Sequence, residues 1–167
     1  MFRLLVQYYQ MLDTIYSALN YERLEIMYKI ALIGAGQIGS RHLQALAKSE
    51  IPICVEVVSR TSQSLVKARE RFEKVQGSGF VKSIKYLHTI RSLSNSIDIA
   101  IIATNADVRR KVIEELIQYK KTRFLLLEKV VFQSIQDFQE IIKLLKTNQV
   151  KAWVNCPRRM YTFYLEV

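Results

Sequence analysis

The sequence predicts an α/β fold in which a doubly wound, parallel sheet of about six strands carries helices on both faces and follows an N-terminal helix. Three observations support this prediction. Short β-branched, apolar runs alternate with amphipathic helical windows from residue 27 onward, and such alternation requires crossover connections between parallel strands. Two of the runs, 99–103 and 124–127, are almost continuously apolar, as expected of strands buried on both faces. A glycine-rich turn joins the first run directly to the first helical window.

The predicted elements of this alternation can be placed in chain order. Strands are expected at residues 29–33, 53–58, 84–86, 98–103, 123–127 and 151–155. Helices are expected at 38–48, 63–74, 108–119 and 135–146, with a short helical turn near 89–93.

Residues 1–26 form a separate helical extension in this prediction. Apolar side chains recur there at helical spacing without a strand signal, at Leu4, Leu5, Tyr8, Leu12, Ile15, Tyr16 and Leu19. No linker rich in Gly, Ser or Pro interrupts the remainder. We therefore divide the chain into an extension at 1–26 and one domain at 27–167.

Composition, charge and cysteine spacing exclude several classes of protein. The chain has 167 residues, half of them apolar, with 25 Lys and Arg against 15 Asp and Glu and a formal charge of +10. No nucleic-acid-binding motif accompanies this charge, so nucleic acid is not an expected partner. No apolar run is long enough for a signal peptide or a membrane span, so we expect a cytoplasmic protein without membrane contact. Cys54 and Cys156 lie far apart, and their spacing indicates neither a disulfide framework nor a metal site.

The sharpest motif is a glycine turn that follows the first strand and opens the first helix. It comprises Gly34, Ala35, Gly36, Gln37, Ile38 and Gly39. In this order, strand, turn and helix meet the physical requirements of a dinucleotide pyrophosphate site. Gly34 permits the turn, Gly36 lets the backbone approach the phosphates, and Gly39 lets the helix pack on the strand. The helix N-terminus would then face the anion. The alternative interpretation is an ordinary glycine-rich turn.

The end of the second strand bears on which dinucleotide is bound. An acidic residue usually follows that strand and binds the ribose hydroxyls of NAD, whereas this sequence has Ser59, Arg60 and Thr61 there. Glu56 lies inside the strand, three residues too early, and is not assigned to the ribose. Charge-assisted bonds from Arg60 and bonds from the two hydroxyls would suit a 2′-phosphate. NADP is therefore favoured and NAD remains an alternative, as does Arg60 as a plain loop cation.

Residues 27–164 resemble the Gfo/Idh/MocA oxidoreductases. The resemblance rests on the opening residues 29–42, on 98–105 at the fourth strand, on 127–129 at the fifth, and on 154–161. It implies a Rossmann domain that binds NAD(P) and takes part in hydride transfer to or from a sugar or cyclitol hydroxyl. It also implies a Glu-Lys-Pro motif beside the nicotinamide, whose first two positions are Glu128 and Lys129 here.

The sequence departs from the family pattern in three places. Val130 stands where the family usually has Pro, and Asn105 follows Thr104 where Thr-Pro is common. Thr104 and Asn105 are still expected to lie against the cofactor. The third departure is that the family's second domain, which supplies the substrate floor and the catalytic Asp and His, has no counterpart before residue 167. We therefore expect a truncated chain that is inactive alone, or one part of an enzyme completed by a separate polypeptide or by a homo-oligomer partner.

Few residues of this chain could carry acid–base chemistry. Lys129 is the catalytic candidate if it becomes buried beside the cofactor, and its alternative is a simple ion pair with Glu128. His42, which lies in the first helix, is expected to be a helix-packing or hydrogen-bonding residue rather than a catalyst, and His88 to lie in a loop. A second class of function remains open, namely a non-catalytic module that binds or senses NADP(H) and acts through a partner.

Arg158 is a further candidate for cofactor binding. Arg158 and Arg159 follow the sixth strand, and ligands of open α/β sheets bind at the carboxyl ends of the strands. The alternative is a surface arginine.

The N-terminal extension allows two interpretations. Family members commonly begin near Met27, so residues 1–26 could be a translated stretch upstream of the domain, which we favour. They could instead be a helix that covers apolar surface.

Overall fold

The computed structural model describes residues 27–156. The predicted helix within residues 1–26 and the candidates Arg158 and Arg159 lie outside the described residues.

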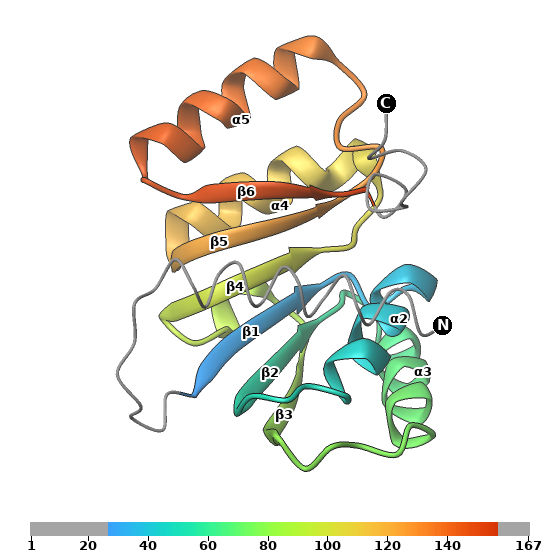
Figure 1. Cartoon of the computed structure of the whole chain (residues 1–167). Helices are drawn as coiled ribbons and strands as arrows, with labels where there is room; N and C mark the ends of the chain where they lie inside the picture. Colours follow the sequence, from blue (N-terminus) through green and yellow to red (C-terminus); the bar gives the residue numbers. More distant parts are fainter. Residues whose placement is uncertain (1–26, 157–167) are drawn as a thin grey trace, which may run out of the picture.

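The described residues form one parallel sheet of six strands in the order β3-β2-β1-β4-β5-β6 (Figure 1). The strands are β1 Tyr28–Ile33, β2 Ile53–Val58, β3 Val81–Leu87, β4 Ser96–Ile102, β5 Lys121–Glu128 and β6 Lys151–Asn155. The helices are α2 Gln37–Leu46, α3 Ser62–Glu73, α4 Ala106–Tyr119 and α5 Ile135–Thr147, with the 3₁₀ turn η1 at Ile90–Ser92. The doubly wound α/β fold is confirmed.

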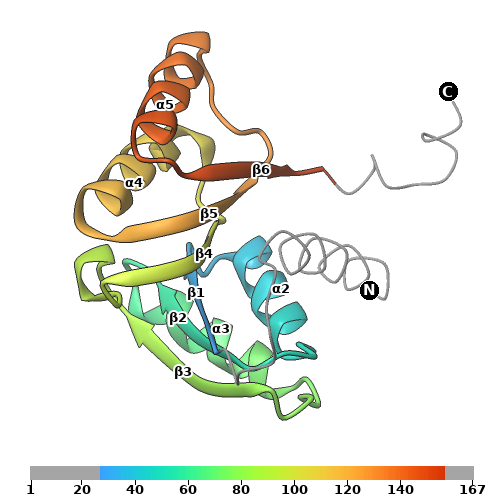
Figure 2. The same cartoon turned by 60° about the vertical axis from the view of Figure 1, so that its left-hand side comes forward.

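Helices cover both faces of the sheet. Figure 2 shows α2 and α3 on one side, by β1 to β3, and α4 and α5 on the other side, by β4 to β6. Each layer has its own apolar core. Side chains of α2 and α3 such as Leu43 and Leu65 pack in the first core, and side chains of α4 and α5 such as Ile113 and Ile141 pack in the second.

Hydroxyl side chains fix where two of the helices begin. The Thr61 hydroxyl accepts a hydrogen bond from the Ser64 N–H at the start of α3. The Ser134 hydroxyl does the same for the Asp137 N–H at the start of α5. Each hydroxyl satisfies one of the donors that a helix leaves unpaired in its first turn.

Strand β3 begins earlier than the sequence predicted. It starts at Val81 rather than at residue 84, and Val81 pairs with Ile53 of β2. Lys82 and Ser83 carry no apolar signal, because β3 is an edge strand whose side chains need not be buried.

Glu56 is a structural anchor inside β2. Its side chain is buried and accepts two hydrogen bonds from Ser94, one from the backbone N–H and one from the hydroxyl, each 2.8 Å long. Lys85 lies 3.8 Å from the same carboxylate. Glu56 therefore holds the connection between η1 and β4 against β2.

The strand order reverses between β1 and β4, which leave the sheet toward opposite faces. Open α/β sheets bind ligands at the carboxyl ends of the strands on either side of such a reversal. The loops that follow β1, β2, β4 and β5 therefore define where a site is expected.

Two further properties of residues 27–156 bear on function. Within this range no three His, Cys, Asp or Glu side chains are grouped so that they could hold a metal ion. None of its helices is long and apolar enough to cross a bilayer.

Candidate nucleotide-binding site

The turn after β1 is built so that only glycine fits at two of its positions. Gly34 has φ of +101°, and a Cβ there would lie 2.8 Å from the Ala103 carbonyl carbon. A Cβ on Gly39 would lie 1.8 Å from the Gly34 oxygen. The Gly34 N–H donates to the Val58 oxygen over 2.9 Å. The turn thus packs closely against the end of β4 and the first turn of α2.

Gly36 differs from these two glycines because the space beside it is open. A Cβ on Gly36 would meet nothing within 4 Å. Gly36 is the N-cap of α2, no side chain caps that helix, and its first turn holds no acidic residue. Gln37 and Ile38 are exposed at the same end. Free N–H groups and the positive end of the helix dipole therefore face open space, which fits a dinucleotide pyrophosphate.

The residues predicted to hold a 2′-phosphate lie at the end of β2, beside this turn. Ser59 is half-buried, and its N–H donates to the Leu87 oxygen over 3.0 Å. Arg60 is exposed. Thr61 is engaged with Ser64, since its hydroxyl accepts from the Ser64 N–H and donates to the Ser64 hydroxyl. Ser59 and Arg60 are therefore the more available donors of the three.

A cavity of about 240 Å³ joins the start of α2 to the loops after β4 and β5. Its lining includes the predicted site residues Ile38, Thr104, Asn105, Glu128 and Lys129. The Thr104 hydroxyl is buried and has no hydrogen-bond partner among the residues that the structure describes. An unpaired buried hydroxyl is unfavourable, so a ligand in this cavity that pairs with Thr104 would remove that penalty.

The carboxylate of Glu128 is held by two side chains at the edge of this cavity. His42 Nε2 of α2 lies 2.6 Å from Glu128 Oε1, and Asn155 of β6 donates to the same oxygen. Burial alone would raise the pKa of Glu128. The hydrogen bonds from His42 and Asn155 and the charges of His42 and Arg109 outweigh burial, so the pKa lies below its ordinary value of 4.5. Glu128 is therefore ionised at neutral pH.

These contacts decide between the alternatives for the neighbouring side chains. Lys129 is exposed, so the burial expected of a catalytic lysine is not provided by the described residues themselves. It forms no ion pair with any residue in the described range and is not the partner of Glu128. The expected hydrogen-bonding role of His42 is confirmed, since its side chain is buried against Glu128. His88 lies exposed after β3, as expected of a loop residue.

Arg109 of α4 is the residue that sequence analysis missed. Its side chain is only 2% exposed. It donates to the Thr104 oxygen in the loop after β4, and to the oxygens of Glu128, Val130 and Val131 after β5. Burial lowers the pKa of Arg109, and the nearby charge of Glu128 opposes that shift. Arg109 thereby joins the two loops that line the cavity.

A signal for Arg109 is present in the sequence. Arg109, Ile113 and Leu116 are the buried residues of α4, and their spacing places all three on one face of the helix. A charged residue on an apolar face needs buried partners. Arg109 also donates to the carbonyl oxygen of Val130, and the peptide bond between Lys129 and Val130 is cis.

Comparison with known proteins agrees with this geometry. Residues 28–156 match the model of the Gfo/Idh/MocA oxidoreductase family, described as an NAD-binding Rossmann fold. The chain belongs to this family. It therefore contains the nicotinamide-dinucleotide-binding domain of a Gfo/Idh/MocA oxidoreductase. No curated protein matches the sequence.

Solved structures share the same fold. The WlbA dehydrogenase from Chromobacterium violaceum, in complex with NADH and UDP-GlcNAcA, has 18% identity and a TM-score of 0.67 over 84% of this chain and 37% of its own. An oxidoreductase from Desulfitobacterium hafniense, described as NADPH-dependent, has 21% identity and a TM-score of 0.64 over 84% and 38%. A super-repressor mutant of Gal80p from Saccharomyces cerevisiae has 16% identity and a TM-score of 0.67 over 84% and 37%. The chain thus spans well under half of each of these structures.

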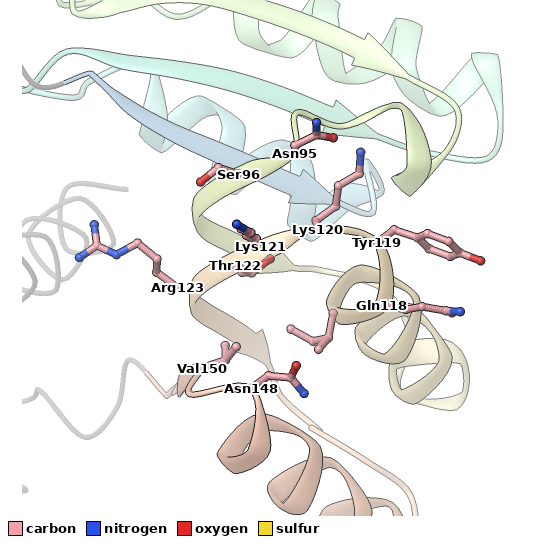
Figure 3. Close-up of a pocket in the computed structure, with 11 residues that line it drawn as sticks. Asn95, Ser96, Gln118, Tyr119, Lys120, Lys121, Thr122, Arg123, Asn148 and Val150 are labelled. Atoms are coloured by element: carbon pink, nitrogen blue, oxygen red, sulfur yellow. The ribbon is translucent and has the colours of Figure 1, made fainter.

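A larger cavity lies at the opposite edge of the sheet and is not part of this site. It has a volume of about 710 Å³ and is lined by residues around the amino end of β5 (Figure 3). Helices α4 and α5 end beside it, so their carbonyl ends place partial negative charge there. Two of the cations in its wall are engaged with nearby acceptors. Lys120 donates to the Arg91 and Leu93 oxygens, and Arg123 lies 3.5 Å from Asp98.

Replacing Arg109 tests whether its side chain holds the loops after β4 and β5 together. We expect Arg109→Met to lower the free energy of unfolding by at least about 2 kcal/mol, because buried carbonyls lose a charged donor. Urea denaturation measures this change. Arg110→Met is the matched control, since Arg110 is one-third exposed and pairs with Glu114, Asp137 and Glu140 at the surface. Equal losses in the two variants would contradict the role given to Arg109.

Acid titration tests the buried carboxylate. The pKa of Glu128 is lower in the folded chain than its ordinary value, so the unfolded state binds the proton more readily. Its contribution to stability is complete above pH 4.5 and is lost as the pH falls through the folded value. We expect a flatter acid slope of the unfolding free energy in Glu128→Gln. The exposed Glu50→Gln is the control and keeps the wild-type slope; an unchanged slope in Glu128→Gln would refute the assignment.

Proposed function

We propose that this chain binds NADP(H) in preference to NAD(H), as the nucleotide-binding half of an oxidoreductase that acts on a sugar or cyclitol hydroxyl. One observation carries the cofactor preference. Glu56, the carboxylate of β2, is buried and bound to Ser94, while the end of β2 offers Ser59 and the exposed Arg60. No carboxylate is therefore available there to bind the free hydroxyls of a ribose, whereas the guanidinium of Arg60 is available to bind a 2′-phosphate.

The glycine turn and the end of β2 would hold the adenosine side of the cofactor. The N–H groups of Gly36, Gln37 and Ile38 would receive the pyrophosphate in the open space before α2. Arg60 and Ser59 would receive the 2′-phosphate. Thr61, which caps α3, would fix the course of the loop between them.

The cavity between the loops would receive the nicotinamide side. Thr104 and Asn105 line it, and Thr104 has a hydroxyl to offer. When bound, the nicotinamide would accept or deliver the hydride. Lys129, exposed at the mouth of the cavity, would orient the substrate hydroxyl and exchange its proton. Arg158 would approach from the segment after β6.

The substrate class rests on likeness alone. The WlbA dehydrogenase shares the fold and was solved with a sugar nucleotide and NADH. The chain spans 37% of that structure, so the remaining catalytic groups of this proposed reaction would lie outside these 167 residues.

A second function is a non-catalytic module that binds NADP(H) and signals its presence to a partner. The likeness to a super-repressor form of Gal80p supports it, since the same fold is present in a protein named for repression. Both functions require the same cofactor site and differ in whether any turnover exists.

Cofactor preference is tested by calorimetric titration of the chain with NADPH and with NADH. We expect tighter binding of NADPH, and we expect Arg60→Ala to reduce that preference at least about tenfold by removing a charge-assisted bond. Lys143→Ala removes an exposed cation from α5 and should leave both affinities unchanged.

Gly36→Val extends the same titration to the pyrophosphate. It should weaken NADPH and NADH equally without loss of stability, because the side chain enters open space. Equal or tighter binding of NADH by the unchanged chain would refute the assignment of Arg60.

Turnover separates the two functions. We expect no sugar or cyclitol oxidation by the 167-residue chain alone, because Lys129 would lack a histidine beside it. His42 is bound to Glu128, and His88 follows β3 at the far edge of the sheet. In a complex that does turn over, Lys129→Ala should lower kcat at least about 100-fold and leave the NADPH affinity nearly unchanged. Lys143→Ala should alter neither quantity. Robust NADPH oxidation by the 167-residue chain alone would contradict the proposal that further catalytic groups are needed.

A further inference from the structure

The cavity at the amino end of β5 has the size of a small-molecule site. Its volume of about 710 Å³ falls within the range of about 300–1,000 Å³ that is usual for such sites. Its lining comes from the start of β4, from the end of α4 with the start of β5, and from the connection between α5 and β6 (Figure 3). We call it the amino-end cavity. Strand β5 has eight residues and is therefore about 26 Å long, so this cavity lies far from the loops of the candidate nucleotide site.

The wall of the amino-end cavity is positively charged. Lys120, Lys121 and Arg123 belong to the lining, and none of the described residues that line it is Asp or Glu. Arg123 is partly neutralised, since it lies 3.5 Å from Asp98. Lys121 is exposed, and its ammonium has no hydrogen bond or ion pair with any residue in 27–156. An anion in the cavity would therefore meet a positive charge that the described chain does not neutralise.

Lys120 is a buried cation without a carboxylate partner. It is 8% exposed, and its ammonium donates to the Arg91 and Leu93 oxygens. These carbonyls supply acceptors but no net negative charge, and no acid within residues 27–156 forms an ion pair with Lys120. A buried charge is unfavourable unless it is paired. An anion in the adjoining cavity would supply the missing negative charge.

Thr122 is a second buried group in this wall that lacks a partner. It is 9% exposed, and its hydroxyl has no hydrogen-bond partner among the residues that the structure describes. An unpaired buried hydroxyl is unfavourable, and Thr122 lines the cavity. Lys120 and Thr122 therefore favour the same kind of ligand, one that carries negative charge and accepts hydrogen bonds.

The carbonyl ends of α4 and α5 oppose such a ligand only weakly, because several of their last carbonyls are paired. The Lys120 N–H donates to the Leu116 oxygen over 2.8 Å. Asn148 donates twice to the Leu144 oxygen, from its backbone N–H over 3.1 Å and from its side-chain amide over 2.9 Å. These donors reduce the partial negative charge that the helix ends place at the cavity.

We propose that the amino-end cavity binds the phosphate group of a small molecule. A phosphate group carries more than one negative charge near neutral pH and has oxygens that accept strong hydrogen bonds, which suits a wall with lysines and a hydroxyl. Lys121 supplies the accessible charge, Thr122 the hydroxyl, and Lys120 a charge behind them. Because the cavity lies at the opposite end of β5 from the glycine turn, its ligand does not compete with a dinucleotide.

NMR titration of the ¹⁵N-labelled chain with inorganic phosphate at constant ionic strength tests the site. We expect saturable shifts at the amides of Lys121, Thr122 and Asn148. Lys121→Gln should weaken phosphate binding at least about tenfold by removing a charge-assisted bond. The control Lys143→Gln removes an exposed lysine of α5 and should leave the affinity unchanged. Equal weakening in the two variants, or shifts confined to residues 34–39, would overturn the proposal, as would the absence of saturable shifts.

Acetate at the same ionic strength distinguishes phosphate from a carboxylate. Acetate carries a single negative charge and offers fewer acceptors, so we expect it to bind at least about tenfold more weakly than phosphate. Equal affinities would show that the cavity does not select phosphate and would overturn the assignment.

Thr122→Val separates a role in ligand binding from a structural role, because valine keeps the shape of threonine and lacks the hydroxyl. Since that hydroxyl has no partner in the described chain, the urea midpoint without phosphate should stay unchanged or rise. Phosphate binding should weaken at least about fivefold. The control Thr147→Val, at an exposed threonine of α5, should leave phosphate binding unchanged. Unchanged phosphate binding in Thr122→Val would overturn the proposal, and so would a lower midpoint, which would show that the hydroxyl is paired within the chain.

Discussion

The buried guanidinium of Arg109 is the interaction on which the candidate site depends. It reaches the carbonyl oxygens of Thr104, Glu128, Val130 and Val131, so one side chain of α4 holds the loops after β4 and β5 together. A buried cation requires such acceptors. The carboxylate of Glu128 adds a compensating charge nearby. The lining of the cavity is thus fixed by charge compensation.

Glu128 extends this arrangement to the rest of the fold. Its side chain is bound by His42 of α2 and by Asn155 of β6, and its backbone oxygen by Arg109 of α4. Elements from both faces and from the edge of the sheet therefore converge on one residue at the carboxyl end of β5. Lys129, the next residue, is left exposed and unpaired among the described residues. The same contacts that fix Glu128 therefore leave Lys129 available.

The proposed cofactor preference rests on how the fold uses one acidic residue of β2. The carboxylate of Glu56 accepts two hydrogen bonds from Ser94 inside β2. It is therefore not available to a ligand at the carboxyl edge of the sheet. The loop that follows β2 exposes Arg60. The charge at the carboxyl end of β2 is therefore set by two residues: Glu56, whose carboxylate faces the core, and Arg60, which faces solvent.

The sequence by itself determined the features that depend on local pattern. The alternation of apolar runs with helical windows predicted the fold class, and the glycine turn predicted where β1 meets α2, because both signals lie within a few neighbouring residues. Strand β3 was predicted too short, since an edge strand tolerates polar side chains such as Lys82. Only the tertiary structure paired His42 with Glu128, 86 residues apart in the chain, and Arg109 with the loop after β5. Partners so distant in sequence leave no periodic signal, because they meet only when the sheet brings the ends of β1, β4 and β5 together.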